Sequence, residues 1–577
     1  MSSKNSIKSG ESVLDETCKT KTTAATATAT VVGDDRALEE GAQKGEIQEA
    51  VPELAHSLSS SSQSFTKATI SRTRLNVIVI GLCLLYFISA LDMTILSTVY
   101  VDISSEYRDL QNGIWIIVSY LLATTAVQPL FGKFSDILGR FEAVAAATLV
   151  FCVGSVICAS AKSMGMLVAG RAIQGIGGGG LISMVSVILS DVTSERDRGK
   201  YTGALAASWG AASAVGPVMG GAIVENASWR IIFWINLPVC VPTIIVMFFA
   251  LKIPRPQGTV REKFRRMDLL GSLVFQGFII PIIIAFSWGG QGHKWISGQV
   301  LGTIFASLAV GVAFLVVEWK VAIEPIMPLR LFKIRNVTAS TIGHFCMGAC
   351  VYSPIYFVPL WELAVKHSSE TNAGLHILPI MVAMVVSATF SGIITTRFGK
   401  YRILIWLSGI FIAVGNSLLL LYKPDTGNGE RIGYLAITGL GLGFGVQSLI
   451  IAAQCAVSGL DMAATTSLVL FMRTLGGIFS LSIHSSVFNN SIRDEARTLA
   501  STFPNYASLI NESLNDQSVI GKGNTLPTEV LVGITNMFHN ALHKVFIGLV
   551  PFSALMVLST LLFKHVDLHS KRRKTIK

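Results

Sequence analysis

The chain has 577 residues, of which 51% are hydrophobic and only 14% are charged, and its formal net charge is +11. Soluble domains carry about 25% charged residues, so this composition excludes an ordinary soluble protein and indicates a membrane protein. The positive charge does not indicate nucleic-acid binding, because the basic residues lie in loops between apolar stretches.

Residues 1–70 are polar and rich in Ser, Thr and Ala. They lack the apolar content of a folded core, and we expect a disordered cytosolic tail. The first apolar stretch begins near Leu75, far from Met1, and is too long for the apolar part of a cleavable signal. It therefore predicts a first membrane span.

Apolar stretches of about 20 residues, the length that crosses a bilayer, recur along the rest of the chain. We predict an all-α membrane protein with fourteen spans, at 75–99, 113–131, 142–161, 165–190, 201–223, 230–251, 268–288, 298–318, 337–361, 374–395, 402–422, 432–454, 463–488 and 545–563.

Basic residues in alternate loops predict which side faces the cytosol. The richer loops lie near residues 133–140, 196–200, 255–266, 320–335 and 397–402. An even number of spans then places both termini in the cytosol. The polar stretch 489–544 is predicted outside it, where the triplet Asn511–Ser513 fits the acceptor pattern for an N-linked glycan.

The sequence gives little support for metal binding, nucleotide binding or catalysis. Seven of the eight cysteines lie in apolar stretches without metal-ligand company, which favours a packing role. Residues Gly175–Gly180 match a dinucleotide pattern, but they follow no strand and lie within a predicted span. No phosphate-binding Gly-Lys-Ser/Thr loop occurs. We expect no cofactor, no metal and no enzyme activity.

Two segments of the chain resemble each other. Gly132–Arg140 and Gly392–Lys400 both lie between apolar stretches, with glycine at the first and eighth positions and a base at the ninth. This duplication is typical of secondary transporters built from parallel repeats.

The first of these segments and four further strings make the pattern specific. In chain order they are Leu91–Asp92, Gly132–Arg140, Arg171–Gly175, Gly210–Gly221 and Trp229–Pro238. Together they resemble the motifs of the major facilitator superfamily, in its fourteen-span drug:proton antiporter branch of fungal type. The resemblance covers roughly residues 75–563. In the second loop Thr396 stands where the family has an acid, which leaves a symmetric gating role for that loop in doubt.

The resemblance implies two six-helix bundles with two extra helices between them. The expected parts are an N-terminal bundle at 71–251, a linker with two extra spans at 252–336, a C-terminal bundle at 337–563 with the non-cytosolic loop 489–544, and a basic cytosolic tail at 564–577.

Asp92 and Arg171 lie within predicted spans, where charged side chains are costly and are functional hypotheses by default. We predict that they belong to a proton-coupling and substrate site, at which a proton and a cationic substrate could compete for Asp92. A water-exposed carboxylate near the membrane surface is the alternative for Asp92. A structural polar link is the alternative for Arg171.

The resemblance implies a cytosolic gate and a rocking seam. The gate would be Gly132, Lys133, Asp136, Gly139 and Arg140, facing the helix that begins near Asp461, and a solvated charge cluster is the alternative. The seam would be the antiporter motif, whose Gly-x-x-x-Gly face allows close helix approach: Gly210, Gly216, Pro217, Gly220 and Gly221.

Other polar and aromatic groups in the spans leave alternatives open. Arg473 needs a partner, and His344, His376 and His484 fit either a proton relay or, more readily, helix packing. Aromatic residues that could line a substrate cavity or anchor at the interface are Trp115, Tyr120, Trp209, Trp234, Tyr352, Tyr356 and Trp361.

The function that this reading favours is a proton-coupled exporter of small organic molecules or drugs, working by alternating access. Its partners would be the substrate, protons and membrane lipid, with no nucleic acid. A vacuolar basic amino acid transporter and a non-transporting membrane sensor are the alternatives. The plasma membrane is favoured over the vacuolar membrane.

Overall fold

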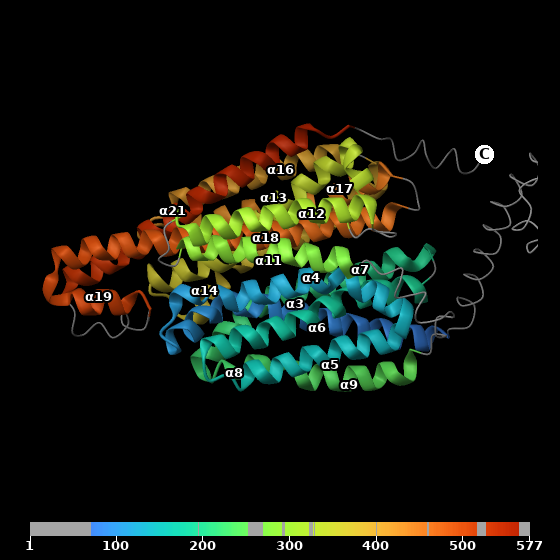
Figure 1. Ribbon diagram of the computed structural model, residues 1–577, viewed down its shortest axis with the longest axis horizontal. Helices are drawn as coiled ribbons and strands as arrows, with labels where there is room; N and C mark the ends of the chain where they lie inside the picture. Colours follow the sequence, from blue (N-terminus) through green and yellow to red (C-terminus); the bar gives the residue numbers. More distant parts are fainter. Residues whose placement is uncertain are drawn as a thin grey trace, which may run out of the picture. The chain divides into compact units, whose positions relative to one another are not determined.

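Long apolar helices, lying roughly alongside one another, make up the fold (Figure 1). The computed structural model describes residues 71–193, 195–251, 269–290, 295–321, 327, 329–399, 401–457, 461–515 and 527–564. In this part, thirteen helices are long and apolar enough to cross a membrane. The predicted span 268–288 is a further apolar helix, whose counted stretch Leu270–Phe286 is shorter. The all-α membrane fold is confirmed.

The N-terminal half consists of six spans. They are α3 (Arg72–Glu106), α4 (Trp115–Leu138), α5 (Arg140–Ala159), α6 (Met164–Val192), α7 (Glu195–Asn226), and the pair α8 (Arg230–Trp234) and α9 (Asn236–Ala250). The second and third spans pack on the fourth, and the first span packs on the fifth.

The C-terminal half repeats this packing. Its helices are α13 (Arg335–Ala364), α14 (Glu370–Leu375) followed by α15 (Leu378–Phe398), α16 (Tyr401–Leu418), α17 (Asn428–Cys455), α18 (Met462–Thr502), α19 (Ala507–Ser513) and α21 (Thr528–Leu561). Helices α15 and α16 pack on α17, and α13 packs on α18. The two halves therefore share one pairing scheme. Short 3-10 turns are η1 (Leu110–Asn112), η2 (Leu329–Lys333), η3 (Leu419–Leu421) and η5 (Pro504–Tyr506).

Two helices lie between the halves in sequence, α11 (Leu269–Gly290) and α12 (Gly298–Lys320). They pack on each other, and α11 also contacts α18 of the C-terminal half and α4 of the N-terminal half. The inserted pair is thus held at one side of the boundary between the halves.

The duplicated segments occupy equivalent places, because each ends the second span of its half. Gly139 and Gly399 follow α4 and α15 with φ of +114° and +69°. Their amides donate to the carbonyls of Ser135 and Thr395, four residues earlier in each case. A side chain is disfavoured at positive φ, which explains the glycine in both copies. We call the end of the bundles that carries these segments the motif end.

The polar stretch 489–544 is largely helical rather than a loop. Helix α18 continues to Thr502 and α21 begins at Thr528. Hydropathy marks where a chain leaves lipid, but a sequence such as Arg493–Ala500 still favours helix in water. The triplet Asn511–Ser513 lies in α19. The predicted tails at 1–70 and 565–577 and the linker segment 252–268 lie outside the described residues.

Candidate functional site

Asp92 of α3 and Arg171 of α6 form an ion pair, with 2.6 Å between Asp92 Oδ2 and Arg171 Nη1. The two side chains are 0% and 1% exposed. This burial excludes the alternative of a water-exposed Asp92. The sequence placed both residues in one site, but the direct contact between them emerges only from the fold.

Amides surround the other carboxylate oxygen. Gln174 Nε2 and Asn236 Nδ2 donate to Asp92 Oδ1 at 2.7 and 3.1 Å. Both amides also donate to Ser155 Oγ, at 2.8 and 3.0 Å. Residues of α3, α5, α6 and α9 therefore meet at one buried carboxylate, which ties four spans of the N-terminal half together.

Arg171 is equally well satisfied. Its Nη1 donates to Gln174 Oε1 at 2.6 Å, and its Nε donates to the Ile116 carbonyl at 3.0 Å. Its guanidinium lies 4.2 Å from the centre of the Tyr120 ring. Removing one partner of such a pair leaves an uncompensated buried charge, at a cost of about 3–5 kcal/mol.

The two halves meet next to this network, through two tyrosines. Tyr356 of α13 donates from its hydroxyl to the carbonyl of Met93, the residue after Asp92, at 2.8 Å. Tyr100 of α3 donates back to the Tyr356 carbonyl at 3.1 Å. The rings lie 6.2 Å apart, edge to face. These contacts join α3, next to Asp92, directly to α13 of the other half.

Further contacts close the halves against each other at the end opposite the motif end. Glu225 of α7 accepts from the amide and hydroxyl of Thr371, at 2.9 and 2.5 Å. Asn489 Nδ2 donates to the Gln111 carbonyl at 3.0 Å, and Arg493 bonds the Gln111 side chain. In the described residues this end is closed.

Tyr107 and Arg230 lie close together at the same end, within the N-terminal half. Arg230 pairs with Glu106 at 3.3 Å, and Tyr107 Oη donates to the Ala161 carbonyl at 2.8 Å. Burial raises the pKa of the Tyr107 phenol, while the nearby Arg230 opposes the shift. The phenol is therefore a neutral hydrogen-bond donor at physiological pH.

The glycines of the antiporter motif face two different ways. A Cβ on Gly216 or Gly220 would meet Thr94 Oγ1 at 2.3 Å or the Ile95 carbonyl at 2.5 Å, so the Gly-x-x-x-Gly face packs on α3 of the same half. This differs from the predicted seam. The reason is that the motif fixes close approach but not the partner helix.

Gly210 and Gly221 are the glycines that face the other half. A Cβ on Gly210 would meet Val385 Cγ2 of α15 at 2.9 Å. One on Gly221 would meet the Glu370 carbonyl of α14 at 2.4 Å. Pro217 joins them, because its carbonyl lies 2.4 Å from where a Cβ on Gly374 would stand. Helix α7 thus carries one internal face and one face toward the C-terminal half.

The gate motif is described only in part. Arg140 donates to Asp191 Oδ2 at 2.7 Å and to Ser135 Oγ at 2.5 Å, which fixes the turn into α5. Gly132 has open space where a Cβ would stand. Asp461, at the expected partner helix, pairs with Arg330 at 2.6 Å. The side chains of Lys133 and Asp136 lie outside the described residues.

A second buried ion pair joins Glu362 and Arg431 in the C-terminal half, again between the first and fourth spans. His376 Nδ1 lies 3.8 Å from Glu362. Burial raises the pKa of the neighbouring Tyr422 phenol. Sequence reasoning missed this pair. The available signal was an acid and an arginine at the edges of two apolar stretches at repeat-related places.

Two of the histidines in apolar stretches are held by ordinary helix contacts. His484 Nδ1 lies 2.7 Å from Ser353 Oγ and 3.0 Å from Ser480 Oγ. His344 Nδ1 lies 3.1 Å from the Ser340 carbonyl. These contacts favour packing over a proton relay.

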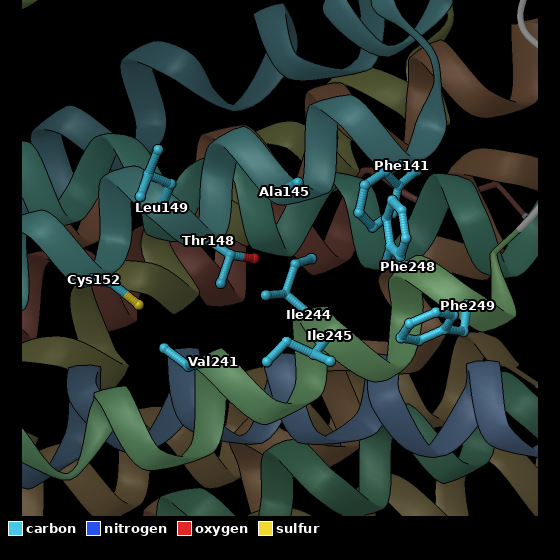
Figure 2. A pocket seen from close by; sticks show the side chains of 10 residues that line it. All are labelled: Phe141, Ala145, Thr148, Leu149, Cys152, Val241, Ile244, Ile245, Phe248 and Phe249. Atoms are coloured by element: carbon cyan, nitrogen blue, oxygen red, sulfur yellow. The ribbon is translucent and has the colours of Figure 1, made fainter.

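An apolar cavity lies between α5 and α9, and its volume is about 470 Å³. Figure 2 shows the side chains that line it. Its lining is aliphatic and aromatic apart from Thr148 and Cys152, and Leu149 and Phe249 are 66% and 67% exposed. The Thr148 hydroxyl donates to its own helix, at the Val144 carbonyl. With no charged side chain, this cavity suits an apolar chain rather than the coupling site.

Two halves with one helix-pairing scheme and spans long enough for a bilayer define the class: a multi-pass membrane transporter built from a repeat. The family model described as "Major Facilitator Superfamily" matches residues 82–481, and the chain belongs to that family.

Curated relatives that match include fungal efflux pumps. "Efflux pump FUS6" of Gibberella moniliformis is 33% identical over 452 residues, covering 78% of this chain and 80% of that protein. "MFS-type efflux pump MFS1" of Trichophyton rubrum is 32% identical over 498 residues, covering 84% and 90%.

Solved structures support the fold. A bacterial homolog of the human lysosomal transporter Spinster, inward-facing and unoccupied, aligns with a TM-score of 0.59 at 14% identity. The alignment covers 85% of this chain and 98% of that one. At this identity the likeness concerns the fold alone.

Proposed function

We propose that this protein is a proton-coupled exporter of small organic molecules, of the fourteen-span drug:proton antiporter type, working by alternating access. Two facts support the proposal. Two relatives that match over most of the chain are named efflux pumps. The N-terminal half also holds a buried, ionised pair at a position where a charge is costly in lipid.

The buried pair carries the proposal, because its charge balance links protonation to movement. A proton on Asp92 would neutralise the carboxylate and leave Arg171 as a lone buried cation. That arrangement costs several kcal/mol, so proton uptake must accompany a rearrangement that gives Arg171 water or a new partner. A coupling site requires this linkage between a proton and a conformation.

The rearrangement has a short route to the boundary between the halves. Asp92 precedes Met93, whose carbonyl accepts the Tyr356 hydrogen bond from the C-terminal half. Movement of α3 that releases Arg171 would also strain or break this bond. Protonation of Asp92 during the transport cycle would thus open the end of the bundles that is closed in this structure.

The sidedness follows from the loop charges. We place the motif end in the cytosol, since the basic loops lie there, and the closed end outside. The described contacts then correspond to a state closed to the outside. We further propose that Lys133, Asp136 and Arg140 gate the cytosolic side, and that the protein resides in the plasma membrane.

Uptake of basic amino acids is less well supported. A cationic substrate would need a free carboxylate, whereas both Asp92 oxygens already accept bonds from Arg171, Gln174 and Asn236. This occupancy also argues against direct competition between a cation and a proton at Asp92.

The test is flux in sealed proteoliposomes under an imposed pH gradient, with a panel of organic acids, cationic drugs and amino acids. We expect the gradient to drive accumulation of at least one class by the wild type. The double variant Asp92→Asn/Arg171→Gln, which keeps the interior neutral, should lose that drive. Gradient-driven accumulation that persists in the double variant would remove the coupling role.

A further inference from the structure

Arg473 lies twelve residues into the 41-residue helix α18, deep within a span. The carbonyl of Arg473 lies against Gly348 of α13, and α18 also packs against α4 and α11. Arg473 is close enough to Tyr86, on α3 of the other half, to interact with it electrostatically. The guanidinium therefore lies at the boundary between the halves.

Within the part of the chain that the structure describes, no acidic side chain pairs with Arg473. Its side chain is partly exposed rather than buried. An arginine in a span without a partner is tolerated where it faces water or a ligand. Since Arg cannot lose its proton, a full positive charge is fixed at this place.

Aromatic side chains lie near Arg473. Tyr352 of α13 packs on α18 one turn beyond Arg473, because a Cβ on Gly477 would meet its ring, and the Tyr86 ring lies 5.0 Å from that of Trp209 of α7. The next residue, Gly210, is one of the two motif glycines that face the other half. Three aromatic side chains, one each from α3, α7 and α13, thus lie in the neighbourhood of Arg473.

Charge balance sets the sign of what could bind. Asp92 neutralises Arg171, and Glu362 neutralises Arg431. Of these three arginines, Arg473 is the one without an acidic partner among the described residues, so a positive charge near the boundary between the halves is left unbalanced. Guanidinium recognises carboxylates through two parallel hydrogen bonds, and aromatic walls suit an apolar body.

We propose that Arg473 is the anion-binding group of the substrate site, and that the substrates are amphipathic organic acids whose carboxylate pairs with Arg473 while their apolar body lies against Tyr86, Trp209 and Tyr352. The inference rests on the proposed export function and names its substrate class. It reverses the expectation of a cationic drug.

The first test measures the electrostatic potential beside Arg473. In a variant with the eight native cysteines replaced by alanine, Tyr86→Cys places a thiol next to the guanidinium. This thiol is allowed to react with two methanethiosulfonates, the anionic sulfonatoethyl reagent and the cationic trimethylammonioethyl reagent. Each reaction rate is divided by the rate of the same reagent with a free small thiol. We expect the anionic reagent to be favoured about tenfold. Arg473→Gln should bring the ratio close to one, whereas Arg473→Lys should keep it high.

Arg497→Gln is the matched control. It removes an arginine from the same helix whose side chain is 80% exposed and pairs with Asp494. The reagent ratio should not change. Three outcomes would overturn the proposal: equal normalised rates of the two reagents in the Tyr86→Cys protein that keeps Arg473, a ratio insensitive to Arg473→Gln, or a thiol that reacts with neither reagent.

The second test measures ligand binding to purified protein in lipid nanodiscs by calorimetry. The probes are 1-naphthaleneacetate and its neutral amide, which share the same body. We expect the acid to bind about tenfold or more tightly than the amide, as a charged hydrogen bond implies. Arg473→Gln should abolish that ratio and Arg497→Gln should keep it. No binding of the acid, or a ratio retained in Arg473→Gln, would contradict the assignment.

Neither test needs a pH gradient or transport. A protein that binds the acid through Arg473 but shows no gradient-driven flux would contradict proton coupling and leave the site intact. Gradient-driven flux with no charge preference at Arg473 would contradict the site and leave the proposed function intact.

Discussion

Arg171 of α6 and Arg473 of α18 both lie deep within membrane spans, but only Arg171 has an acidic partner among the described residues. Arg171 is 1% exposed and is held by Asp92, Gln174 and the Ile116 carbonyl. Arg473 is partly exposed and lies near Tyr86 of the opposite half.

The difference separates two uses of a positive charge in lipid. A paired arginine inside one half can hold that half together and respond to a proton on its partner. An unpaired arginine at the boundary between the halves is available to a ligand. We therefore propose that the same residue type serves coupling in one half and substrate recognition in the other.

The largest expected effect is the loss of stability when one partner of the Asp92–Arg171 pair is replaced. Arg171→Gln leaves Asp92 buried without its cation, and Asp92→Asn leaves Arg171 without its anion. Each single change should destabilise the protein by about 3–5 kcal/mol. The double variant should recover most of this loss. Thermal unfolding in detergent, followed by tryptophan fluorescence, measures all three. Additive losses in the double variant would show that the two charges do not interact.

The next effect concerns the face of α7 toward the C-terminal half. Gly221→Leu inserts a side chain where a Cβ already meets the Glu370 carbonyl, so the closed end should separate and transport should be lost. The protein should still insert in the membrane. Gly203→Leu is the control on the same helix, since Gly203 has open space at its Cβ position. Flux in vesicles matched for protein content distinguishes them, and equal flux in both would contradict the role of Gly221.

A smaller effect is expected from the tyrosine contact between the halves. Tyr356→Phe keeps the ring that packs on Tyr100 and removes the bond to the Met93 carbonyl, which is worth about 1 kcal/mol. The equilibrium should shift about fivefold toward opening at the end closed here. Distances between spin labels at Asn226 and Pro424, both exposed, report that opening. An unchanged distance distribution would show that the Tyr356 hydrogen bond does not hold this end closed.

The smallest expected effect is that of Arg473→Gln on stability, which is compared with the effect of Arg171→Gln. Arg473→Gln leaves no described acid unpaired, so the free energy of unfolding should change by less than about 1 kcal/mol. The same melting assay as for Arg171→Gln applies. A loss as large as that of Arg171→Gln would mean that Arg473 is a structural residue.

The sequence predicted the helical membrane fold and the repeat, because hydropathy and glycine spacing are local properties. It also identified Asp92 and Arg171 as candidate site residues. Their contact was not predictable, since it depends on the rotation of α3 and α6 about their axes. Asn236 and Gln174 stood inside quoted motifs, yet their donation to Asp92 needed the same information. For Gly216 and Gly220 the sequence predicted close packing, and only the fold identified α3 as the partner.

The most direct test asks whether the Asp92–Arg171 pair couples protonation to the position of the halves. Spin labels at Asn226 and Pro424, in protein held in lipid nanodiscs, give the separation of the two halves at the closed end as the buffer is changed from mildly alkaline to mildly acidic. We expect the population of separated halves to change with pH in the wild type and to be independent of pH in the Asp92→Asn/Arg171→Gln variant. A response of the same size in both proteins would contradict this expectation.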